Sequence, residues 1–163
     1  MRNNNNIIEK EYLKLISLGF KIINKEMRPW GGFFVIDESQ SQKFADRYFD
    51  GRDVKYLRIT TKISPKILIV SPKSKLSWQY HKRRAEIWKV VKGKIGVTKS
   101  INDIENDPLE YNDGDIITLG QGERHRLIGL DDYGIIAEIW QHTDPNNPSD
   151  EDDIIRISDD YGR

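Results

Sequence analysis

The sequence predicts an all-β fold, either a sandwich or a barrel, with one short helix at the N-terminus. Short runs rich in β-branched and aromatic residues recur along most of the chain. Turn residues separate these runs, as at Lys92-Gly93-Lys94. Helical periodicity is clear only near the N-terminus. Many short strands at near-regular spacing are typical of sandwiches and barrels, so we expect that class of fold.

The expected helix covers residues 7–18, with Asn6 as its N-cap and Gly19 as the residue that ends it. Its apolar residues recur with helical spacing on one face: Ile8, Tyr12, Leu15 and Ile16. We expect this face to pack onto the barrel or onto a partner subunit.

The expected strands follow the helix in order. They cover residues 20–24, 32–37, 66–71, 76–81, 85–91, 94–99, 115–119, 124–128 and 134–141. Residues 38–63 are polar and poorly patterned, and we interpret them as an ordered excursion or a flexible lid. The tail over 143–163 is acidic and begins with a Pro/Asn-rich turn, so we expect His142, directly before that turn, to be exposed to solvent.

Composition excludes several classes of protein. The chain has 163 residues, which suits one domain, and its 26 Lys and Arg equal its 26 Asp and Glu. This balance produces no field that would attract nucleic acid or an anionic membrane. No run approaches the ~18 apolar residues of a membrane-spanning helix. The N-terminus lacks the pattern of a secretory signal and there is no cysteine, so we expect a cytoplasmic protein.

Four possible metal ligands form the main functional pattern: Gln79, His81, Glu86 and His125. On a strand, Gln79 and His81 would point to the same face because they are two residues apart. Imidazole, carboxylate and amide groups together suit Zn, Fe, Mn, Co or Ni. A site without Gln79 is an open alternative, since an amide can instead satisfy a backbone group. The two histidines could also be hydrogen-bonded core residues, but the two spaced motifs together favour a metal site.

These two motifs resemble those of cupins, and further segments resemble one family of cupins. The chain is similar to the cupin domain of type II mannose-6-phosphate isomerases, which is usually fused behind a guanylyltransferase. The similarity covers residues 28–163, with 38–63 poorly matched. The matching segments are Arg28-Pro29-Trp30-Gly31, Lys66, residues 76–81, residues 84–88 and residues 151–163 with their closing Tyr161-Gly162-Arg163.

The resemblance implies a jelly-roll barrel, a double-stranded β-helix, over residues 28–163, preceded by a helix and lead-in strand over 1–27. It also implies a homodimer and an aldose–ketose isomerisation of a phosphorylated sugar on a divalent metal, with Zn favoured over Co, Mn, Ni or Fe. Metal ligands carried over by position are Gln79, His81, Glu86 and His125. Catalytic roles are implied for Glu86 and Arg84. Contacts to the substrate are implied for Arg84, Lys66, Arg156 and Arg163, because cations, and Arg above all, suit phosphate.

Departures from the family pattern keep other functions open. Ile87 stands where the family usually has a histidine after the motif glutamate, and an aliphatic side chain transfers no proton. Trp140 stands where the family has a glutamine. The alternative to the isomerase is therefore a non-catalytic cupin that binds a sugar or another metabolite, and a structural module with a degenerate pocket is a third hypothesis. No phosphate-cradling, glycine-rich segment is present, so we expect no guanylyltransferase activity.

Overall fold

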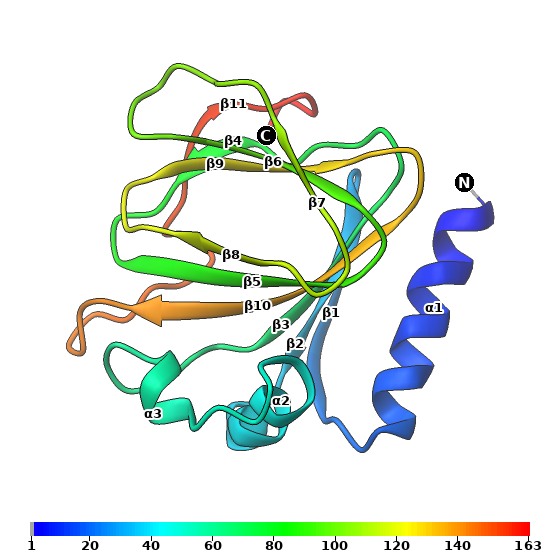
Figure 1. Cartoon of the computed structure of the whole chain (residues 1–163), viewed down its shortest axis with the longest axis vertical. Helices are drawn as coiled ribbons and strands as arrows, with labels where there is room; N and C mark the ends of the chain where they lie inside the picture. The colour runs from blue at the N-terminus through cyan, green and yellow to red at the C-terminus, as the bar shows by residue number, and fades with distance from the viewer. Residues whose placement is uncertain (1) are drawn as a thin grey trace.

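Two antiparallel sheets stack face to face in the computed structural model, which describes residues 2–163 and the side chains from residue 5 on (Figure 1). The helices are α1 (Arg2–Ser17), the 3-10 helix η1 (Glu38–Gln40), α2 (Ser41–Tyr48) and α3 (Val54–Leu57). The strands are β1 (Ile22–Arg28), β2 (Gly31–Ile36), β3 (Lys66–Val70), β4 (Trp78–Tyr80), β5 (Arg84–Lys92), β6 (Ile95–Ser100), β7 (Leu109–Tyr111), β8 (Ile116–Leu119), β9 (Arg124–Gly129), β10 (Gly134–His142) and β11 (Ile155–Ser158).

The six-stranded sheet has the order β1-β2-β3-β10-β5-β8, and the five-stranded sheet has the order β11-β4-β9-β6-β7. Strands distant in sequence are neighbours, as where β10 lies between β3 and β5. The predicted all-β class with an N-terminal helix is confirmed. Two short strands, β7 and β11, were not predicted; they have only three and four residues and are mostly exposed, so their brief apolar alternation was overlooked.

The middle of the six-stranded sheet, strands β2, β3 and β10, is buried on both faces, and β10 shows how. Side chains alternate along a strand, so its two faces pack in two separate cores. Ile135, Ala137 and Ile139 belong to the core on the outer face. Ile136 belongs to the core between the two sheets. A strand buried on both faces has a near-continuous run of apolar residues, as β10 does. The exception is the buried carboxyl of Glu138, which lines a cavity.

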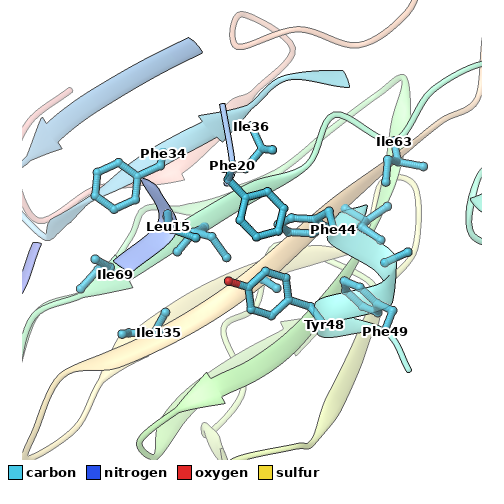
Figure 2. Close-up of a cluster of buried hydrophobic side chains, with 14 of the residues drawn as sticks. Leu15, Phe20, Phe34, Ile36, Phe44, Tyr48, Phe49, Ile63, Ile69 and Ile135 are labelled. Carbon is cyan, nitrogen blue, oxygen red and sulfur yellow. The ribbon is translucent and has the colours of Figure 1, made fainter. Parts of the chain in front are cut away.

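Helices α1 and α2 cover the outer face of this sheet (Figure 2). Phe44, Tyr48 and Phe49 from α2 and the residue after it pack with Phe20 in an aromatic cluster. Of the two interpretations of residues 38–63, the ordered excursion is therefore correct and the flexible lid is wrong. Their polar appearance arises because only one side of a short helix is buried.

Helix α1 begins nearer the N-terminus than predicted, because residues 2–6 are helical and Asn6 is not its N-cap. Once a helix is nucleated, each further residue adds one hydrogen bond, so a polar run can extend it. Gly19 ends the helix as predicted, with φ at +82°. Its N–H bonds Ile16 O at 2.9 Å, and the next N–H bonds Leu15 O at 3.0 Å, which is a Schellman motif. Among the described residues no helix is long and apolar enough to cross a membrane.

The C-terminal tail folds back onto the barrel. Strand β11 pairs with β4, and Arg156 lies opposite Gln79. His142 lies directly before the tail, at the end of β10, and its exposed fraction is 0 %. The expectation of an exposed His142 is therefore wrong. The side chain bonds Ser64 and the backbone of Ser149, so segments on both sides of it bury the ring.

Candidate metal centre

Three of the predicted metal ligands are brought together from both sheets. Glu86 lies on β5 in the six-stranded sheet. In the five-stranded sheet, Gln79 on β4 lies opposite His125 on β9, and His81 directly follows β4. Because side chains alternate, His81 and Gln79 project to the same side of their strand. The stacking of the two sheets then places His81 and His125 against Glu86.

The three side chains form a compact buried group. Their possible ligand atoms all lie within 4.8 Å of one another. Glu86 Oε1 is 3.2 Å from His81 Nε2, and Glu86 Oε2 is 3.7 Å from His125 Nε2. Each of these side chains is 2 % exposed. The distances are close enough for a single ion to contact all three.

Main-chain oxygens orient both imidazole rings. His81 Nδ1 lies 2.6 Å from Asp153 O, and His125 Nδ1 lies 2.9 Å from Glu123 O. A carbonyl oxygen only accepts hydrogen bonds, so each Nδ1 carries a proton. The Nε2 atom of each ring is therefore the nitrogen turned towards Glu86. Ring orientation by a carbonyl on the other nitrogen is the usual arrangement of metal-binding histidines.

The surroundings of His125 show whether these residues suit a metal ion. Its Nε2 is buried and has no hydrogen-bond partner among the described residues. Burial lowers the pKa of His125 to about 4, so the ring is neutral at pH 7 and Nε2 offers a lone pair. A buried polar atom without a partner is costly, and an ion would satisfy it. Two imidazoles and one carboxylate fit a divalent transition-metal ion.

Gln79 lines the same cavity and is buried. Its Oε1 accepts a hydrogen bond from Ser77 Oγ at 2.8 Å. Amide oxygens have two lone pairs, so this bond leaves one available. Its role as a fourth ligand stays a prediction.

Arg84 is buried beside Glu86, beneath the ring of Trp140, with 3.7 Å from its Cζ to the ring centroid. Its Nε donates to Glu86 Oε1 at 2.8 Å and its Nη1 donates to Ser149 Oγ at 2.8 Å. Burial alone would raise the pKa of Glu86, but its contacts with the His81 ring and with the Arg84 guanidinium hold it well below its usual value. Glu86 is thus an anion at neutral pH, and the donors of Arg84 are largely engaged within the protein.

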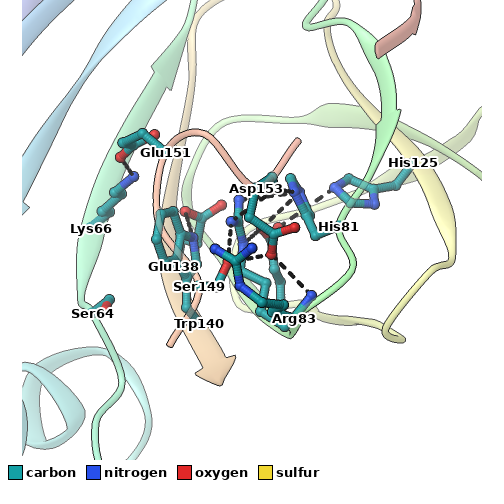
Figure 3. Close-up of polar contacts among 12 residues, drawn as sticks. Ser64, Lys66, His81, Arg83, His125, Glu138, Trp140, Ser149, Glu151 and Asp153 are labelled. Atoms are coloured by element: carbon teal, nitrogen blue, oxygen red, sulfur yellow. Dashed lines mark hydrogen bonds and ion pairs between the residues drawn. The ribbon is translucent and has the colours of Figure 1, made fainter. Parts of the chain in front are cut away.

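A second buried carboxyl, Glu138, shares this cavity (Figure 3). Its Oε1 accepts from Trp140 Nε1 at 2.7 Å and its Oε2 accepts from Trp88 Nε1 at 2.9 Å. Burial, and next the charge of Glu86, raise the pKa of Glu138 to about 8. Glu138 therefore holds its proton at neutral pH. Its pKa is close to the working pH, where a proton-transfer group is most efficient. Its position in the motif pattern had not been enough to assign it a role.

Cationic side chains line the cavity in addition to these groups: Arg28, Lys66, Arg84, Arg156 and Arg163. Lys66 pairs with Glu151, and its Nζ lies 4.0 Å from the centroid of the Trp140 ring. The side chain of Arg156 is exposed and makes no hydrogen bond or ion pair with the described residues. Sequence reasoning missed Arg28, although its segment was part of the resemblance. The substrate contacts predicted for Arg84, Lys66, Arg156 and Arg163 stay predictions.

Ile87 points away from the cavity. It packs against the outer core, under the helices, and pairs with Ile139 in the sheet. Glu86 and Ile87 are adjacent on β5, so they project to opposite faces. A histidine at position 87 would also lie on the outer face. The absence of a histidine there therefore removes no proton-transfer group from the cavity.

The chain matches the sequence profile of one known protein family. The profile of a family described as "Mannose-6-phosphate isomerase C-terminal" matches residues 53–159. None of the curated proteins matches the chain.

Solved structures of other proteins share the fold. The capsular polysaccharide assembling protein CapF from Staphylococcus aureus has a TM-score of 0.55 and 15% identity, over 82% of this chain and 34% of CapF. The oxalate decarboxylase of Lactobacillus farciminis has a TM-score of 0.54 and 15% identity, over 82% of this chain and 33% of that protein. The chain thus spans about a third of the length of these proteins. These likenesses concern the fold, and the predicted cupin barrel is confirmed.

Proposed function

This chain belongs to the mannose-6-phosphate isomerase C-terminal family, and we propose that it is a metal-dependent isomerase that interconverts an aldose phosphate and a ketose phosphate. The observation that carries the proposal is the buried group of His81, Glu86 and His125 in a cavity lined with cations. These three residues would hold the ion. When bound, a divalent cation supplies Lewis-acid polarisation of the sugar's carbonyl or hydroxyl oxygen.

Glu138 is the group that we assign to proton transfer. Aldose–ketose isomerisation moves a proton between two adjacent carbons, so one group must take up that proton and return it. Glu138 lines the cavity, and its pKa of about 8 suits both uptake and release near neutral pH. Glu86 and Arg84, the residues predicted to be catalytic, then have different roles. Glu86 would bind the metal, and Arg84 holds the Glu86 carboxylate in place.

The phosphate would bind the cations that line the cavity outside the metal group. Arg156 supports this most directly because its guanidinium is exposed and unpaired among the described residues. Arg163 and Lys66 line the same cavity but already pair with Asp159 and Glu151. A planar guanidinium can bind two phosphate oxygens at once. We therefore assign Arg156 the leading part in phosphate recognition.

A non-catalytic binder is the alternative function. Its main support was Ile87, since an isoleucine cannot transfer a proton. Because Ile87 packs on the outer face of β5, that support is lost. The isomerase is therefore the better proposal, and turnover is the measurement that separates the two.

The test is an isomerase assay with mannose 6-phosphate on metal-stripped protein, repeated after adding back Zn, Co, Mn or Ni. We expect turnover to return with metal and to be absent from the His81→Ala variant under the same conditions. Stoichiometric metal binding without turnover on a panel of aldose phosphates would instead support the binder. Light scattering on the same preparations would test the expected homodimer.

A further inference from the structure

Asp153 holds the chain around His81 at three points (Figure 3). Its main-chain oxygen lies 2.6 Å from His81 Nδ1. Its carboxylate accepts from the backbone N–H of Lys82 and of Arg83, each at 3.0 Å. These two N–H groups directly follow His81 in the chain. One residue thus binds both the ring of His81 and the turn that carries this ring.

The segment that contains Asp153 is itself tied to the barrel. Ser149 Oγ donates to Asp153 Oδ2 at 2.6 Å and accepts from Arg84 Nη1 at 2.8 Å. The backbone N–H of Ser149 donates to His142 Nδ1 at 2.9 Å. We call residues 149–153 the C-terminal clamp. This clamp contacts the possible metal ligand His81, although it lies far from both sequence motifs along the chain.

The Asp153 carboxylate keeps its charge although its residue is only 5 % exposed. Burial acts to raise its pKa, but the hydrogen bonds from Ser149, Lys82 and Arg83 outweigh burial and lower it. An ionised carboxylate accepts hydrogen bonds more strongly than a neutral one. The two backbone hydrogen bonds from Lys82 and Arg83 to this carboxylate therefore hold the clamp to the turn.

We propose that Asp153 is a positioning residue of the metal centre, which it keeps in its binding geometry by orienting His81 through the C-terminal clamp. This inference rests on the proposed metal site. The main-chain oxygen of Asp153 can only accept, so it keeps the proton on Nδ1 of His81. The lone pair of Nε2, which faces Arg84 Nη2 at 3.2 Å, is then the one that a metal would take. Asp153→Ala keeps this main-chain oxygen but removes the carboxylate that fixes the turn carrying His81. Disturbing such a supporting contact typically weakens metal affinity by about 10–100-fold.

The test compares Asp153→Ala with a matched variant, Asp152→Ala. Both variants remove one carboxylate from the clamp. The Asp152 side chain is exposed and makes no polar contact with the described residues, so it serves as the control. Metal-stripped proteins are titrated with Co²⁺, which is followed by visible absorption, and a chelator competes for the ion. Thermal unfolding of the stripped proteins shows whether each variant is folded.

We expect D153A to bind Co²⁺ about 10–100-fold more weakly than the wild type and D152A to bind it like the wild type. Nitrogen NMR of the His81 ring should show the Nδ1–H tautomer in the wild type and in D152A, and a mixture of tautomers in D153A. If D153A does not fold, Asp153→Asn replaces it. This variant keeps the size of the side chain and one of its two acceptors.

Equal Co²⁺ affinity in the wild type and in a folded Asp153 variant would overturn the inference and leave the metal site standing. Equal losses in D152A and D153A would also overturn it, because the effect would then be one of charge. Absence of Co²⁺ binding by the wild type would overturn the metal site and this inference together.

Discussion

Glu86 and Glu138 share one hydrogen-bond donor, because Trp88 Nε1 lies 3.0 Å from Glu86 Oε2 and 2.9 Å from Glu138 Oε2. Two carboxylates this close in a buried cavity cannot both be charged without a large cost. Arg84 stabilises the charge of Glu86, and Glu138 keeps its proton. Two carboxyl groups whose pKa values are driven apart commonly divide the roles of an active site. Here one would bind a metal and the other would transfer a proton.

Glu138→Gln should therefore abolish most of the turnover but not metal binding. Glutamine has the shape of a protonated glutamate and can still accept a hydrogen bond from an indole N–H, so the fold should persist. Loss of a general acid–base group typically costs about 10²–10⁴-fold in rate. The measurements are turnover of mannose 6-phosphate and Co²⁺ affinity. Unchanged turnover in E138Q would assign the proton transfer to another group.

Arg156→Ala should weaken binding of phosphorylated sugars selectively. We expect the KM for a sugar phosphate to rise on the order of tenfold, the equivalent of about 1.4 kcal/mol, with little change for the unphosphorylated sugar. Arg52→Ala is the control, because Arg52 is exposed and does not line the cavity. If Arg84→Ala gives the phosphate-selective effect and R156A does not, then Arg84 binds the phosphate, as the family resemblance implies.

Ile87→His should leave the chemistry unchanged and lower stability. Position 87 lies on the outer face of β5 among apolar side chains, so the imidazole would be partly buried there without a designed partner. We expect a loss of about 1–3 kcal/mol in the free energy of unfolding. Urea unfolding gives the stability, and the isomerase assay gives the rate. A clear gain in turnover would mean that residue 87 can reach the substrate.

His142 should make the protein sensitive to acid. Burial lowers its pKa to about 4, below the usual 6.5, so between these values the unfolded chain binds more protons than the folded one. The free energy of unfolding must then fall as pH drops through this window, by up to about 1.4 kcal/mol per pH unit. Urea unfolding at pH 7 and pH 5 measures the effect, with metal-stripped protein throughout.

His142→Ala provides the comparison. It should be less stable than the wild type at pH 7, since the Ser149 N–H loses its acceptor, but should lose less stability on acidification. His125 also titrates near pH 4, so part of the acid sensitivity should remain in H142A. An equally steep decline in both proteins would exclude His142 as a source.

Much of the fold could be predicted because strand patterns are local. The alternation of Gln79 with His81 and of Glu86 with Trp88 placed each pair on one face. Glu86 and Trp88 lie on β5 and Gln79 lies on β4, with His81 directly after it. The same alternation already implied that Ile87 faces away from Glu86, a conclusion that sequence reasoning did not draw. Strand β11 alternates in the same way, as Ile155-Arg156-Ile157-Ser158, but its four residues lie in an acidic tail and were missed.

The amino-acid sequence by itself determined the all-β class, the N-terminal helix and the identity of the possible metal ligands, because these depend on residue types and on spacings of a few residues. The tertiary structure alone decided the clamp by Asp153, the burial of His142 and the proton on Glu138. A contact such as that of Asp153 with His81 joins residues 72 apart, and a shifted pKa depends on which groups exclude water from the site. Neither is encoded in a local pattern, since both arise only when the two sheets and the tail pack together.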